Sequence, residues 1–81
     1  MSSRETNWDN FNRTMQTAIS QLDQLIVRLN ILAIRETNLE KKDNYYSEII
    51  NAMETQCRIL KDYKKLLQEQ LRLLRNLSND E

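Results

Sequence analysis

Apolar residues recur at intervals of three and four along almost the whole chain, which is the spacing of one face of an α-helix. With Trp8 placed at heptad position a, one register runs from residue 8 to residue 74 without a break. Its a and d positions are apolar at 17 of 20 sites, whereas the 40% apolar composition would give about eight. Strand-like alternation is not visible. The pattern predicts an all-α protein.

The periodic pattern falls into two runs, separated by a weakly apolar segment over residues 37–44. We therefore expect one helical domain over residues 1–81, folded as an antiparallel helical hairpin that forms a helical bundle by self-association or with partner chains. Asn38 is expected to end the first helix in the left-handed conformation, and Asp43 or Asn44 to cap the second. The expected elements are a helix over about residues 5–37, a link over about 38–43 and a helix over about 44–77.

One long parallel coiled coil of about 105 Å is the alternative, because the register is continuous. Two observations favour the hairpin. Glu36 and Asp43 occupy successive a positions, where equal charges of two parallel chains would meet. The apolar flank also changes sides between the two runs. It lies at e in the first run (Ile19, Ile26, Ala33) and at g and c in the second (Ile49, Tyr63, Leu77; Tyr45, Ala52, Ile59, Leu66, Leu73).

The apolar arcs are wider than a seam between two helices requires. On the first helix we expect Leu22, Leu25, Leu29 and Leu32 to form the inner seam. A further apolar group lies on the opposite side, either inside a homo-oligomer or against a different protein. The predicted protein-interface residues are Val27, Ile31, Ile34, Ile59, Tyr63, Leu66, Leu73 and Leu77.

Composition argues against catalysis. The chain has no His, Gly or Pro, so histidine acid–base chemistry, histidine metal ligands and glycine-rich phosphate loops are excluded. Cys57 is the single cysteine and permits no internal disulfide; its place on an apolar arc predicts a small buried hydrophobe. We expect no enzyme activity, no cofactor, no bound metal and no small-molecule substrate.

Charge and hydropathy set the expected partners and location. Twelve basic and twelve acidic residues give zero net charge, which lacks the footprint of a nucleic-acid or anionic-lipid binder. No segment has the run of about 18–20 apolar residues that a membrane span needs, and no apolar run resembles a signal peptide. We therefore expect no membrane insertion and an intracellular protein, cytoplasmic or nuclear.

Residues 58–75 carry a net charge of +4, and this basic face supports an alternative function. It would bind nucleic acid or acidic tails. The other interpretation is a solvated face with internal pairs, because Asp62 precedes Lys65 by three residues and Glu69 precedes Arg72 by three.

The function that these observations favour is that of a non-enzymatic protein–protein interaction module. We expect a small helical subunit or scaffold of an oligomeric or multi-subunit assembly, of the cytoskeletal, kinetochore, tethering or transcription type. Its expected partners are other helical protein chains, in a homo-oligomer or a hetero-complex.

Overall fold

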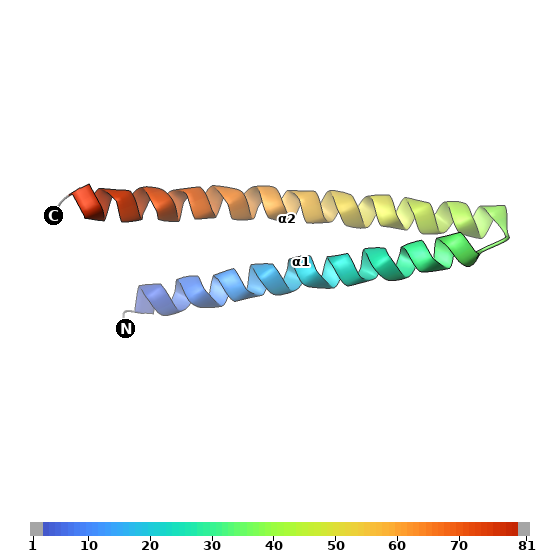
Figure 1. The fold of residues 1–81 in the computed structure, drawn as a ribbon, viewed down its shortest axis with the longest axis horizontal. Helices are drawn as coiled ribbons and strands as arrows, with labels where there is room; N and C mark the ends of the chain where they lie inside the picture. Colours follow the sequence, from blue (N-terminus) through green and yellow to red (C-terminus); the bar gives the residue numbers. More distant parts are fainter. Residues whose placement is uncertain (1–2, 80–81) are drawn as a thin grey trace.

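The computed structural model describes residues 3–79, which form two α-helices and the link between them. Helix α1 spans Ser3–Arg35 and helix α2 spans Leu39–Asn79. The helices run antiparallel along each other (Figure 1), within extents of 64 × 20 × 13 Å. The predictions of an all-α chain and of a hairpin are confirmed. The continuous rod is not what the chain forms, because it reverses direction at the link.

The link comprises only residues 36–38, and Asn38 explains why it is short. Its side-chain Oδ1 accepts a hydrogen bond from the backbone N–H of Lys41 at 3.0 Å, and its carbonyl oxygen accepts one from Lys42 at 2.9 Å. These are the bonds of a helix N-cap, so α2 begins at Leu39. The two expected caps, Asp43 and Asn44, both lie inside α2.

The expected left-handed conformation of Asn38 is wrong. Within residues 3–79, no residue has a positive φ. Asparagine suits both ends of a helix, and here its side chain satisfies a backbone N–H of the following helix rather than ending the preceding one. The carboxylate of Glu36 supports the reversal by accepting the N–H of Asn38 at 3.1 Å.

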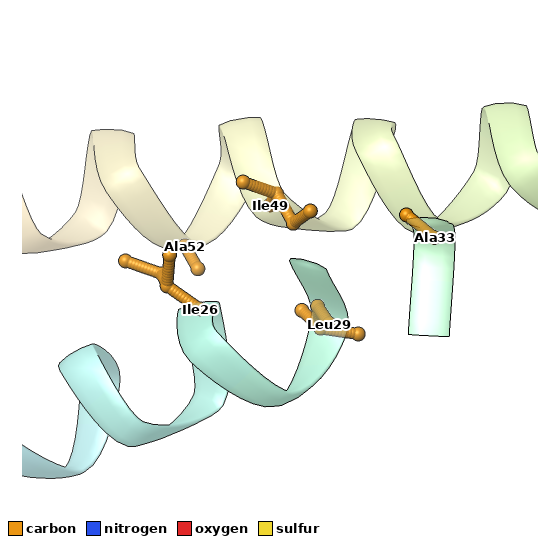
Figure 2. Packing of buried hydrophobic residues seen from close by; sticks show 5 residues of the cluster. All are labelled: Ile26, Leu29, Ala33, Ile49 and Ala52. Atoms are coloured by element: carbon orange, nitrogen blue, oxygen red, sulfur yellow. The ribbon is translucent and has the colours of Figure 1, made fainter. Parts of the chain in front are cut away.

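The helices meet through positions a and e of α1 and positions c and g of α2. In Figure 2, the side chains of Ile26 and Ala52 meet between the two helices. Half-buried Leu22 and Tyr45 pack against this core. The buried residues are Ile26, Leu29 and Ala33 of α1 and Ile49 and Ala52 of α2.

This arrangement corrects the expected inner seam of α1. Leu29 is buried and Leu22 half-buried, but Leu25 and Leu32 are 42% and 47% exposed. Small side chains at Ala33 and Ala52 let the two backbones approach closely, and interhelical distance depends on the side chains at the contact. The helices therefore pack through their apolar flanks rather than through the d positions of α1.

Away from the link, the helices diverge (Figure 1) and the contact becomes partly polar. The Gln56 side chain donates to the carboxylate of Asp23 and, at 3.4 Å, to the carbonyl oxygen of Ile19. Farther along, the Tyr63 hydroxyl donates to Oδ1 of Asn12. The hairpin is therefore tightest near the link.

Candidate interaction surface

The most extensive apolar feature outside the hairpin contact runs along α2, and we name it the α2 stripe. It occupies positions a and d of the heptad register, and its large apolar side chains are 42–62% exposed. Lys64 interrupts it once. The stripe covers 28 residue steps, or about 42 Å of helix at 1.5 Å per residue. Its members are Tyr46, Ile50, Met53, Cys57, Leu60, Leu67, Leu71 and Leu74.

The α2 stripe and the α1 contact lie on different faces of one helix. Ile49 and Ala52, at positions g and c, are buried against α1, whereas Ile50 and Met53 are each one residue farther along and exposed. One residue step turns an α-helix by about 100°, so a stripe at a and d cannot face the neighbour that c and g face. The stripe therefore has no neighbour within the described hairpin.

A second apolar group lies on the outer side of α1, and we name it the α1 patch. It consists of Val27, Ile31 and Ile34, which are 57%, 43% and 71% exposed. These residues sit at positions f, c and f, away from the a and e positions that face α2. All three were predicted interface residues, and the structure leaves all three accessible.

The five interface residues predicted on α2 divide into two groups. Leu66 and Leu77 are exposed, whereas Ile59, Tyr63 and Leu73 are half-buried. All five occupy positions c or g, the positions through which α2 meets α1. Tyr63, for example, donates a hydrogen bond from its hydroxyl to Asn12 of α1. None of the predicted interface residues belongs to the stripe at a and d, and the change of flank between the two runs is the sequence signal that points to it.

Cys57 belongs to the stripe and is exposed, so its expected burial is wrong. The physical reason is its a position, which α1 does not cover. The stripe's chemistry is otherwise that of aliphatic, aromatic and thioether side chains. Among the side chains of residues 7–79, no three Cys, Asp or Glu residues lie together in a group that could hold a metal ion.

The hollows beside the helix contact are open to solvent. One of about 350 Å³ is lined by Leu22, Leu25 and Leu29 of α1 and by residues of α2 that include Glu48 and Thr55. Such an apolar hollow, with polar side chains at its rim, suits the side chains of a partner better than the enclosed binding of a small molecule.

The basic segment contains one ion pair among the described residues. Arg72 donates through Nε to Oε2 of Glu69 at 3.1 Å, and a second guanidinium nitrogen reaches the other carboxylate oxygen. This hydrogen bonding lowers the pKa of Glu69 and raises the pKa of Arg72. The expected pair between Asp62 and Lys65 is not formed. The pairing of Arg72 favours a solvated face over a binding site for acidic tails or nucleic acid.

None of the helices within residues 3–79 combines the length and hydropathy that crossing a membrane requires.

The chain matches no protein-family model, and no curated protein sequence and no solved structure is significantly similar to it.

Proposed function

We propose that this protein is a non-enzymatic protein–protein interaction module, a small helical subunit or scaffold of a larger assembly. The observation that carries the proposal is the α2 stripe, a line of large apolar side chains that α1 leaves uncovered. Apolar surface of this extent and regularity marks a contact with another protein. The heptad spacing of the stripe supports a helix as the contacting element, because a and d side chains fit between the side chains of a facing helix.

The total surface area supports the same proposal. A compact monomer of 9.8 kDa exposes about 5,200 Å², whereas this chain exposes 6720 Å². The difference of about 1,500 Å² is close to what each partner buries in an obligate complex. Two helices in one layer bury only one side of each helix, so further helices have to supply the rest of a core.

Helix packing is the proposed mechanism. Complete burial of a large apolar side chain contributes on the order of 1.5–3 kcal/mol, and the stripe residues already lose part of their exposure in the hairpin. The remaining gain in burial free energy per residue is smaller, but all eight stripe residues contribute such a gain. The α1 patch is proposed as a second, shorter contact on the other helix.

Alkylation of the single cysteine tests the proposal in the protein's own assembly. Cys57 lies in the middle of the stripe and is exposed in the hairpin, so a covering helix slows its reaction with a maleimide. In a size-fractionated extract of cells that produce the tagged chain, we expect the chain in fractions above the mass of its tagged monomer, with slow alkylation of Cys57 there. Alkylation of the same chain in denaturant gives the reaction rate of an unprotected Cys57. Monomeric migration with the denatured rate contradicts the proposal.

A triple substitution in the stripe tests whether this surface makes the contact that protects Cys57 from alkylation. Replacing Leu60, Leu67 and Leu71 by Gln, Lys and Glu changes side chains that are 44–45% exposed, so helix content by circular dichroism should stay the same. The particle mass should fall, because the contact through the stripe is lost. An unchanged mass would assign the assembly to another surface.

The α1 patch supplies the matched variant, because it offers three exposed apolar residues on the other helix. Replacing Val27, Ile31 and Ile34 by Gln, Lys and Glu should also preserve helix content and should remove any contact that this patch makes. A variant that keeps its mass and all its partners would show that the patch is ordinary surface.

A further inference from the structure

We infer that the occupant of the α2 stripe is the α2 stripe of a second copy, packed antiparallel to the first. This inference rests on the proposed function and names its partner. Because the net charge of the chain is zero, overall charge repulsion does not oppose self-association. The arrangement of charges beside the stripe selects both the direction and the register of the pair.

The stripe is complementary to itself in one antiparallel register. In antiparallel helix pairs, an a residue of one helix shares a layer with a d residue of the other. When Cys57 of one copy lies opposite Leu60 of the other, every stripe residue except Leu74, at the end, has a partner within the stripe region of the second copy. Leu71 then meets Tyr46, Leu67 meets Ile50, and Lys64 meets Met53, and the two-fold axis repeats each layer.

Charges at position e favour this register over its neighbours. Position e lies beside the stripe on the side away from α1, and Glu54 and Lys61 occupy it with exposed side chains. In antiparallel pairs, e residues of the two helices face each other. The register just described brings Glu54 of each copy to Lys61 of the other, and Glu40 of each copy to Arg75 of the other.

A shift by one heptad in either direction loses these pairs. One shift places Glu54 opposite Glu54, and the other places Lys61 opposite Lys61. Equal charges facing each other disfavour both alternatives.

Lys64 argues against parallel packing. In a parallel pair, Lys64 would meet Lys64 of the second copy inside the apolar stripe, where two unpaired cations are costly to desolvate. In the antiparallel register it lies opposite Met53 and next to Glu54 of the other copy. Its long side chain can cover apolar surface while its ammonium group reaches that carboxylate. The single polar residue of the stripe therefore specifies the direction of packing.

Charge reversal tests the register on the purified chain. Glu54→Lys and Lys61→Glu each place equal charges at both symmetry-related contacts, so sedimentation equilibrium should show dimerisation roughly tenfold weaker for each variant. The double variant restores opposite charges at residues 54 and 61 and should recover most of the lost affinity, although Lys64 no longer has a carboxylate at residue 54 of the other copy. Glu48→Lys is the control, because Glu48 is exposed at position f, outside the proposed interface. Single variants that dimerise like the natural chain overturn the register, as does a double variant weaker than both.

Spin-label distances test the direction independently. In the antiparallel register, labels on Arg58→Cys, an exposed position outside the stripe, lie within about 30 Å of each other in a Cys57→Ser background. Labels on Asn76→Cys, in a Cys57→Ser background, lie about 50 Å apart at 1.5 Å per residue. Short distances at both positions would show parallel packing and overturn the inference.

A purified chain that stays monomeric at millimolar concentration also overturns the inference. If Cys57 is nevertheless protected in the cell extract, a different protein covers the stripe and the proposed function stands. If Cys57 is unprotected there as well, the proposed function fails with it.

Discussion

The half of the hairpin next to the link and the half next to the chain ends have the same helices but different contacts. Among the described side chains, the five buried ones all lie near the link, within residues 26–33 and 49–52. Toward the ends, the helices diverge, and the side chains between them are half-buried or polar, such as Tyr63 and Asn12. Alanines face the opposite helix in the first half, and aromatic and amide side chains take their place in the second.

The difference shows that close packing in this hairpin depends on small side chains more than on apolar content. The end half is rich in large apolar residues, including a stacked pair, Trp8 and Phe11, with ring centroids 5.9 Å apart. Bulky residues hold helices apart, whereas Ala33 lets the backbones approach and is itself completely buried. The hairpin is therefore anchored near its link, and its large apolar side chains remain available to other chains.

Truncation of the core should have the largest effect on stability. Leu29→Ala removes a buried side chain from the link half and leaves a cavity that neighbouring residues fill only partly. We expect a loss of about 2–4 kcal/mol in the free energy of unfolding. Urea unfolding followed by circular dichroism, at fixed chain concentration, measures it. Leu32→Ala, three residues away and 47% exposed, is the control and should cost less than about 1 kcal/mol. Equal losses would show that the seam does run through d positions.

The same enlargement in each half sharpens the comparison. Ala33→Leu adds three carbon atoms where the backbones are closest and should cost about 1–3 kcal/mol through overpacking. Ala18→Leu makes the same change on the same helix at a half-buried d position, outside the close contact near the link. We expect a change of less than about 0.5 kcal/mol there. Thermal unfolding at fixed concentration measures both. A greater loss at residue 18 than at residue 33 would reverse the assignment of the tight half.

The cap at the link should contribute less than the core. Asn38→Ala removes the side-chain oxygen that accepts the N–H of Lys41, and we expect a loss of about 1 kcal/mol. Asn38→Asp keeps an acceptor at the helix start and should retain most of the stability. Glycine in place of Asn38 separates the two possible roles of this residue. If Asn38 adopted the left-handed conformation, Asn38→Gly would stabilise the chain, whereas for an N-cap it should be slightly destabilising.

The helices and the reversal between them could be predicted from the sequence, because periodicity and a weakly apolar segment are local signals. The role of Asn38 could not, since the same residue type suits the end of one helix and the start of the next. Whether Asn38 ends the first helix or begins the second depends on the relative stability of the two caps. That relative stability depends on the adjoining helices.

The inner seam could be predicted only in part. Counting apolar residues favours positions a and d, and it predicts that Leu25 and Leu32 lie inside the hairpin. Packing instead selected the flank that contains Ala33 and faces Ala52, because a close approach of two backbones depends on shape. The change of flank between the two runs was visible in the sequence, but its use as the contact was not. The position of the exposed stripe followed only once the contact was known.

Cysteine accessibility measures most directly which face of α2 meets α1. Cys57 reports the stripe, and Ala52→Cys in a Cys57→Ser background reports the buried face with a small change in volume. Maleimide alkylation is followed over a dilution series of the purified chain. Residue 52 should stay protected at every concentration, whereas Cys57 should approach the rate of the denatured chain on dilution. A protected Cys57 and a reactive cysteine at residue 52 in the dilute chain would contradict the account.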